Sequence, residues 1–323
     1  MLLDGFGRRI EYLRLSVTDR CDLRCSYCMP RRFNDYAEPQ HWLSFDEVER
    51  LLSLFARLGL KRIRLTGGEP LLRRNLPDLA LRLSVLPGIE DLSLSTNGTR
   101  LKEFAPRLRR AGVARLNVSL DSLDRDRVRA ICKRDVLPQI LEGLEAARKE
   151  GFAPIKINMM AMAGTTDDEI DAMVAYCIER GFVLRLIESM PVGEPGRNAG
   201  FLDLHPVQER LRDRFGLVDG VVPGGGPARY LVSPDCRFQI GFIAPISRHF
   251  CASCNRVRLG VDGTLYLCLG QNDSVDLRGP LRSGCTDAEI AEALLAGLRL
   301  KPARHEFQKR PHQVLRLMSS TGG

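Results

Sequence analysis

Residues 12–28 read YLRLSVTDRCDLRCSYC, a short strand-like run that leads directly into three cysteines spaced C-x₃-C-x₂-C. Three thiolates this close together can hold a metal. Since a 4Fe-4S cluster takes one cysteine for each of its four irons, three cysteines leave one iron open for substrate chemistry. Structural zinc usually pairs C-x₂-C with a second ligand pair, and no fourth Cys or His follows nearby. The sequence therefore predicts an iron-sulfur cluster on Cys21, Cys25 and Cys28.

The composition is that of a globular protein of 323 residues, long enough for one large domain or two ordinary ones. No apolar run has the roughly 18 residues that a membrane span needs, and the N-terminus lacks a signal-peptide pattern. Six of the ten cysteines form two tight triplets, a pattern that favours metal ligation in a reducing compartment over disulfides. We therefore expect a cytoplasmic protein with no membrane partner. The other four cysteines are scattered: Cys132, Cys177, Cys236 and Cys285.

The formal charge of +8 favours an anionic partner, either a nucleotide or nucleic acid. Aromatic residues make up only 6% of the chain, and no basic run has the interleaved aromatics of a single-strand binding surface. Much of the charge is expected on solvated helix faces such as residues 107–110. The composition therefore predicts no nucleic-acid partner.

Strand-like runs alternate with helix-period runs up to residue 190, which predicts about six βα units and a parallel sheet. Six units are too few for a closed eight-unit barrel, and no GxGxxG follows the first strand. The expected fold is an open, incomplete β/α barrel, with a smaller C-terminal α+β region that closes it. The predicted strands cover residues 12–17, 62–65, 92–95, 115–120, 155–160 and 183–187.

Polar motifs follow the predicted strands or, in the case of Asn158, lie within one, at the edge where parallel α/β sheets bind ligands. After residue 190 the pattern breaks into Gly- and Pro-rich loops, including residues 223–227, PGGGP. We therefore expect one domain over residues 1–215 and a C-terminal region over residues 216–323. The motifs are the cysteine loop, residues 66–70 (TGGEP), residues 95–98 (STNG), Asp121, Asn158 and residues 188–191 (ESMP).

The cysteine loop, with Tyr27 before its last cysteine, resembles the signature of the radical S-adenosylmethionine enzymes. Together with residues 13–21, residues 66–70 and the C-x₂-C-x-R-x-R of residues 251–258, it is similar to the GTP 3',8-cyclase family of molybdenum cofactor biosynthesis. The resemblance covers nearly the whole chain. It implies that a reduced cluster cleaves S-adenosylmethionine, and that the resulting 5'-deoxyadenosyl radical starts the cyclisation of GTP to (8S)-3',8-cyclo-7,8-dihydroguanosine 5'-triphosphate.

The second triplet, Cys251, Cys254 and Cys268, has C-x₂-C-x₁₃-C spacing, which is less specific than the first. Zinc could take these three thiolates together with His249, and the spacing leaves that alternative open. The resemblance implies instead a second 4Fe-4S cluster, whose open iron anchors the guanine base.

The resemblance also implies a set of cofactor contacts. Gly67 and Gly68 carry no Cβ and can bring the backbone close to a ligand. Carried over from the family, S-adenosylmethionine contacts are expected at Tyr27, Gly68, Ser119 and Met190. Ser95 stands where the family usually has Thr, and we expect it to keep a hydrogen bond to the substrate.

Five cations occupy alternating strand positions that would face a cavity: Arg14, Arg64, Lys156, Arg256 and Arg258. Buried charges need partners, and Arg forks suit a triphosphate. The family pattern agrees in placing GTP contacts at these positions. Arg14, Arg256 and Arg258 are also expected to act in catalysis by supplying charge and a proton. Arg62 stands where relatives carry Lys.

The resemblance extends to partners. It implies a reductant such as flavodoxin or ferredoxin, a second enzyme that converts the product to cyclic pyranopterin monophosphate, and a homodimer. It also implies a mobile Gly322-Gly323 tail that inserts into the active site. Two alternatives stay open: a twin-cluster radical enzyme acting on a peptide or RNA, and a zinc-binding, nucleic-acid-associated protein without catalytic activity.

Overall fold

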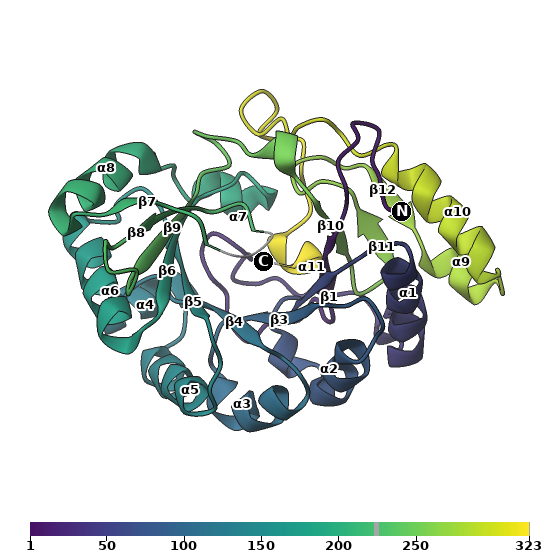
Figure 1. Ribbon diagram of the computed structural model, residues 1–323, viewed down its shortest axis with the longest axis horizontal. Coiled ribbons are helices and arrows are strands. Elements are labelled where there is room, and N and C mark those ends of the chain that lie inside the picture. The colour runs from purple at the N-terminus through teal and green to yellow at the C-terminus, as the bar shows by residue number, and fades with distance from the viewer. Residues whose placement is uncertain (223–225, 323) are drawn as a thin grey trace.

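The computed structural model describes residues 1–222 and 226–322, so residues 223–225 of the predicted boundary loop and Gly323 lie outside it. A single curved sheet runs through the molecule (Figure 1). Its core is formed by six parallel strands that pair in chain order, which confirms the predicted βα units. These strands are β1 (Tyr12–Ser16), β2 (Arg62–Thr66), β3 (Asp91–Thr96), β4 (Arg115–Ser119), β5 (Ile155–Ala161) and β6 (Val183–Glu188).

Alternation along the strands decides which side chains face the helices and which face the interior. In β1, Leu13 and Leu15 are fully buried in the core, while Arg14 between them lines a cavity. In β2, Ile63 and Leu65 alternate with Arg64 in the same way. Because strand side chains alternate with period two, apolar residues seal the sheet against the helices. The intervening polar residues are left on the concave face.

Most of the helices lie on the outer, convex side of the sheet (Figure 1). Capping boxes begin three of them, with Ser44, Thr166 and Thr286 as the N-cap residues. Eight helices are α1 (Phe45–Arg57), α2 (Leu76–Ser84), α3 (Leu101–Arg110), α4 (Arg125–Cys132), α5 (Leu137–Lys149), α6 (Asp167–Arg180), α7 (Gly193–Asn198) and α8 (Leu204–Phe215). None of the described helices is both long and apolar enough to cross a membrane.

The C-terminal region adds strands to both edges of the sheet. β9 (Gln239–Ile243) pairs parallel with β6, and β10 (Arg256–Leu259) pairs parallel with β1. Two antiparallel strands follow outside each of them, and the described residues do not close the sheet by hydrogen bonds. The open α/β barrel is thus as expected, but the C-terminal region also supplies two of its parallel strands. The outer strands are β7 (Val218–Gly220), β8 (Arg229–Val232), β11 (Thr264–Tyr266) and β12 (Ser274–Asp276).

The last three helices are α9 (Arg278–Arg282), α10 (Asp287–Leu298) and α11 (Met318–Thr321). Figure 1 shows α11 inside the curve of the sheet, away from the outer helix layer. The end of the described chain therefore lies in the interior. Three 3-10 turns complete the secondary structure of the described residues: η1 (Pro39–His41), η2 (Pro70–Leu72) and η3 (Cys251–Ser253).

Candidate active site

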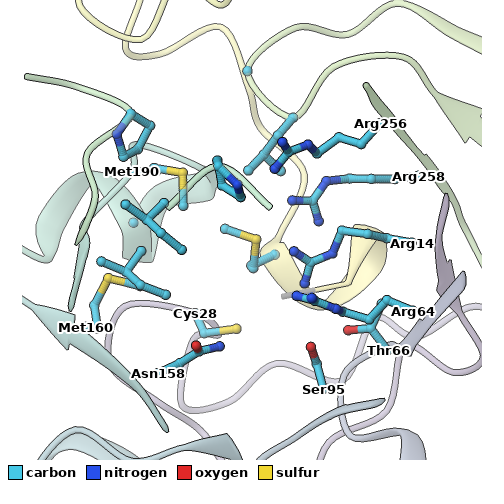
Figure 2. A pocket seen from close by; sticks show the side chains of 18 of the residues that line it. Arg14, Cys28, Arg64, Thr66, Ser95, Asn158, Met160, Met190, Arg256 and Arg258 are labelled. Atoms are coloured by element: carbon cyan, nitrogen blue, oxygen red, sulfur yellow. The ribbon is translucent and has the colours of Figure 1, made fainter. Parts of the chain in front are cut away.

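A cavity of about 280 Å³ opens on the concave face of the sheet, and both cysteine triplets contribute to its wall. Residues more than 200 positions apart meet here because β10 pairs with β1. Figure 2 shows Cys28 and Met190 on one side of this space, and a column of four arginines on the other. The cysteines that line it are Cys21, Cys25, Cys28, Cys251, Cys254 and Cys268.

The loop that carries the first triplet is held by the backbone of Gly68 and Glu69, in the turn after β2. The N–H of Gly68 donates to Thr18 O at 2.8 Å, and that of Glu69 donates to Arg20 O at 2.8 Å. A Cβ on Gly68 would lie 2.3 Å from Arg20 O. The glycines were expected to let backbone approach a ligand. The structure shows a nearer reason, which is close packing of this turn against the cysteine loop.

We expect Gly68→Ala to lower the iron content at the first triplet, because the added Cβ must push the cysteine loop away from β2. Iron quantification and the visible spectrum after anaerobic reconstitution would measure the loss. The control is Gly181→Ala, at the C-cap of α6, where a Cβ meets nothing within 4 Å. That variant should cost only about 1 kcal/mol of stability and keep its iron. Equal iron in the two variants would contradict the prediction.

The buried carboxylate of Glu69 holds the turn after β2 in place. Glu69 has 0% exposure and accepts hydrogen bonds from Leu71 N at 3.0 Å, Thr96 Oγ1 at 2.7 Å and Asn97 N at 2.6 Å. Burial raises its pKa to about 7, even though these three donors act in the opposite direction. Glu69 thus ties the end of β2 to the end of β3.

The first triplet consists of free thiols, of which Cys21 and Cys25 pack against the hydrophobic core. Burial raises the pKa of Cys21 to about 12 and that of Cys28 to about 11, so without a cation these thiols keep their protons. A bound metal removes such protons, because only thiolates ligate it. Three free thiols on one loop beside a cavity fit a cluster that leaves one iron open.

The second triplet lies among cations. Burial raises the pKa of Cys254, but nearby Lys301 and Arg256 outweigh it, so the pKa falls below its ordinary value. Lys301 is buried, lines the cavity, and donates to Leu267 O, directly before Cys268 in the chain. This second set of free thiols also fits a cluster held by thiolates.

The zinc alternative for the second triplet needed His249, which is not among the residues lining the cavity. His305 lines it instead, with its ring 6.1 Å from that of His249. Within residues 1–222 and 226–322, no three His, Cys, Asp or Glu side chains are grouped closely enough to hold one ion. A cluster, unlike a single ion, binds each thiolate through a different iron.

Four of the five predicted cations line the cavity. Arg258, Arg14 and Arg64 are register neighbours on β10, β1 and β2, and Arg256 lies two residues before Arg258 (Figure 2). Burial and the other arginines lower the pKa of Arg14 well below its ordinary value and that of Arg258 to about 10. The Nε atoms of Arg14 and Arg256 are buried without a hydrogen-bond partner. Such crowding of like charges indicates a site for an anion.

Lys156, unlike these arginines, does not line the cavity. It shares a face of β5 with Asn158 and Met160, which do line it. Its Nζ donates to the hydroxyl of Tyr230 at 3.2 Å. Burial, Arg185 and two further arginines lower its pKa to about 7. Arg62 also lies away from the cavity and pairs with Glu11 at 3.7 Å.

Arg185 is a cavity residue that the sequence analysis missed. It is 3% exposed, and its Nε donates to Asn158 Oδ1 at 2.9 Å. Its Nη2 donates to Asn117 Oδ1, so its neighbours on β4 and β5 offer amides and no carboxylate. The signal was an arginine between two leucines of a buried parallel strand, where a charge is rare.

The predicted cofactor residues Tyr27, Gly68, Ser119 and Met190 all line the cavity, as does Ser95. The Ser95 hydroxyl is buried without a partner, which leaves it available to a ligand. Asp121 was noted only as following a strand. It accepts from the Tyr27 hydroxyl at 2.9 Å and from Met160 N at 2.9 Å, and burial raises its pKa to about 6.

The end of the chain reaches the same cavity. Met318 and Ser319 of α11 line it, and Arg258 Nη1 donates to the carbonyls of Thr321, at 3.2 Å, and Gly322. A Cβ on Gly322 would lie 2.2 Å from Thr66 Cγ2, so only glycine fits there. The predicted mobility of the Gly322-Gly323 tail stays a prediction, and Gly323 lies outside the described residues.

Comparison with known proteins identifies the family. The radical SAM superfamily profile matches residues 15–177, and that of Molybdenum Cofactor Synthesis C matches residues 182–307. A GTP 3',8-cyclase of Ectopseudomonas mendocina is 46% identical over 100% of this chain and 98% of the relative. The chain belongs to the GTP 3',8-cyclase family of radical SAM enzymes.

Other relatives of similar identity are also named GTP 3',8-cyclase. GTP 3',8-cyclase 1 of Pseudomonas aeruginosa is 45% identical over 99% of both chains, and the cyclase of Paracoccus denitrificans is 44% identical over 100% of this chain and 96% of the relative. Membership of this family identifies the chain as an enzyme, which removes the non-catalytic zinc-binding alternative. Streptococcus suis SuiB bound to S-adenosylmethionine has the same fold, with a TM-score of 0.65 at 16% identity over 90% of this chain and 68% of that one.

Proposed function

We propose that this GTP 3',8-cyclase family member converts GTP to 3',8-cyclo-7,8-dihydro-GTP in molybdenum cofactor biosynthesis, with two 4Fe-4S clusters in one cavity. The observation that carries the proposal is that both cysteine triplets and four arginines face the same space. Full-length relatives named GTP 3',8-cyclase and the Molybdenum Cofactor Synthesis C match support it.

The first triplet and its surroundings are assigned to S-adenosylmethionine. When bound, a 4Fe-4S cluster there supplies the electron that cleaves the sulfonium. Gly68, Ser119 and Met190 would hold the cofactor, with the Tyr27 backbone at its adenine. The bond from Tyr27 to Asp121 fixes that end of the cysteine loop.

The arginines are assigned to GTP. Arg14, Arg64, Arg256 and Arg258 would bind the triphosphate, because crowded cations with unpartnered Nε atoms gain most from a polyanion. Arg14, Arg256 and Arg258 would also supply charge and a proton in the reduction that ends the cyclisation. The second triplet would hold the cluster that anchors guanine, and Ser95 would donate to the substrate.

Partners and setting follow from the proposed reaction. The enzyme needs a one-electron reductant such as flavodoxin or ferredoxin, and a second enzyme to convert its product to cyclic pyranopterin monophosphate. The ten free cysteines favour the reducing cytoplasm. A homodimer, and a division into residues 1–215 and 216–323, rest on the family resemblance and the sequence.

Removing each triplet separately tests the assignment. The protein is reconstituted anaerobically and assayed with dithionite, S-adenosylmethionine and GTP. The wild type should hold about eight irons, and each triple Cys→Ala variant about four. Loss of the first triplet should abolish 5'-deoxyadenosine. Loss of the second should leave slow 5'-deoxyadenosine formation and no cyclised nucleotide. A second-triplet variant that still cyclises GTP would overturn the proposal.

Lys156 lies just outside the cavity wall, and we keep it as a proposed contact of the GTP triphosphate. Such a contact makes the affinity for GTP depend on pH. The Lys156 pKa of about 7 in the free protein rises when an anion binds, so binding takes up a proton above pH 7. The dissociation constant should be flat below pH 7 and rise by up to about tenfold per pH unit above it.

Anaerobic calorimetric titration of the reconstituted enzyme from pH 6 to pH 9 measures this dependence. The matched variant is Lys156→Arg, which stays charged throughout and should bind GTP with no rise above pH 7. Lys156→Met should bind weakly at every pH. A Lys156→Met profile identical to that of the wild type would exclude Lys156 from the GTP site.

A further inference from the structure

A fourth thiol lies against the first cysteine triplet. Cys132 is the last residue of α4, is 8% exposed, and belongs to neither triplet. Its Sγ lies 3.8 Å from Sγ of Cys25. That is van der Waals contact between two sulfurs, closer than two thiolates bound to separate irons of one cluster. Cys132 is therefore placed as a neighbour of a ligand and not as a fourth ligand.

The backbone holds this contact on both sides of Cys25. The N–H of Arg24 donates to Cys132 O at 3.2 Å, and the N–H of Ser26 donates to Ile131 O at 3.0 Å. Just beyond the helix, Arg134 Nη1 donates to Asp22 O at 3.0 Å. The cysteine loop thus lies along the C-terminal end of α4, which fixes Cys25 opposite Cys132.

Cys21 Sγ, by contrast, receives hydrogen bonds from N–H groups. It accepts from Leu23 N at 3.4 Å and from the side-chain amide of Asn97 at 3.8 Å. The backbone N–H of Ser319 acts to lower the pKa of Cys28, although burial raises that pKa on balance. The neighbour of Cys25 Sγ is Cys132, whose S–H is a weak donor. In the structure Cys25 Sγ is the donor of this pair and Cys132 Sγ the acceptor. A Cys25 bound to iron carries no proton, so in the loaded protein the remaining hydrogen of the pair is that of the Cys132 thiol.

We propose that Cys132 is a positioning residue that donates an S–H···S hydrogen bond to Cys25 and thereby sets the reduction potential of the first cluster. The inference rests on the proposed function, because it requires a cluster on the first triplet. Hydrogen bonds to ligating sulfurs stabilise the more negative, reduced state of a cluster. The Cys132 thiol therefore makes the cluster easier to reduce before it delivers an electron.

Potentiometric titration monitored by electron paramagnetic resonance tests this in the second-triplet variant C251A/C254A/C268A, which leaves only the first cluster. In this background, the further substitution Cys132→Ala removes the hydrogen-bond donor to Cys25 Sγ, whereas Cys132→Ser replaces the S–H with an O–H donor. With about four irons in each protein, the midpoint potential should become more negative with alanine and return to or above the parent value with serine. Equal potentials in the parent and the alanine variant overturn the inference.

Failure of the proposed function gives a different result. A parent variant that binds no iron would overturn the first-cluster assignment, and this inference with it.

A second measurement uses the cluster-free wild-type chain, so it does not depend on folding of the variants. Oxidised glutathione should give a Cys25–Cys132 disulfide, with two thiols oxidised and one glutathione disulfide reduced to two thiols. Peptide mapping that finds Cys25 paired only with Cys21 or Cys28 would contradict the contact.

Discussion

Replacing Arg14 with methionine should stabilise the ligand-free protein and at the same time abolish most GTP turnover. Arg14 lies between Arg258 and Arg64, and its Nε has no partner. Removing one of several crowded like charges should raise the free energy of unfolding by about 1 kcal/mol, a modest gain because the cavity is open to water. The same change removes a guanidinium group that would bind the triphosphate, and it should lower kcat/KM for GTP at least about 100-fold.

Thermal unfolding with and without GTP separates the two effects. The wild type should be stabilised by GTP, whereas Arg14→Met should start from a higher Tm and gain little from GTP. The control is Arg110→Met on the exposed face of α3, which should change neither the Tm nor turnover. If Arg14→Met without GTP has a lower Tm than the wild type, Arg14 stabilises the fold, and its crowding is not evidence for an anion site.

Replacing Glu188 with alanine should remove the second cluster while leaving the first in place. Glu188 ends β6, is 0% exposed, and accepts hydrogen bonds from Ile246 N at 2.9 Å and Ser247 N at 3.1 Å. The Ser247 hydroxyl donates to its other oxygen. These bonds hold the segment that runs from β9 into Cys251. Without the carboxylate, each buried donor costs about 1–3 kcal/mol, and the loop should leave its position.

The expected result is about four irons per chain in place of about eight, with continued 5'-deoxyadenosine formation and no cyclised nucleotide. Iron analysis and product chromatography measure both. Glu194→Gln, an exposed carboxylate of α7, is the control and should behave as the wild type. Glu188→Gln should have an iron content between those of the wild type and the alanine variant. Its amide oxygen can still accept a hydrogen bond, but its NH₂ group would face a donor of Ile246 or Ser247. Full iron in the alanine variant would show that the loop is held by other contacts.

Much of the fold could be predicted from the sequence, because its signals are local. The six predicted strands match β1 to β6 within two residues at each end. Period-two alternation is visible in Leu13-Arg14-Leu15, and it already assigns the arginine to the inner face. The cysteine spacings and the C-terminal pair Arg256 and Arg258 likewise indicate a site without reference to the rest of the chain.

Other features depend on contacts between distant segments. Nothing local shows that β10 pairs with β1, yet this register places Arg258 beside Arg14. Period-two spacing puts Lys156 on the same face as Asn158 and Met160, but only the structure shows that it lies outside the cavity wall, with its Nζ bonded to the Tyr230 hydroxyl. The sequence marks Arg185 as an unusual charge in a buried strand, but only the structure shows that its partners are Asn117 and Asn158 on two other strands.

The strands, the two cysteine triplets and the sheet face that carries the arginines can all be predicted from the chain, because periodicity and ligand spacing are short-range properties. The folded molecule was needed to show that both triplets share one cavity, that Gly68 packs against the cysteine loop, and that Cys132 touches Cys25. These are distances between segments far apart in the chain. They are set by sheet register and by packing of the helices on the sheet, which no local pattern encodes.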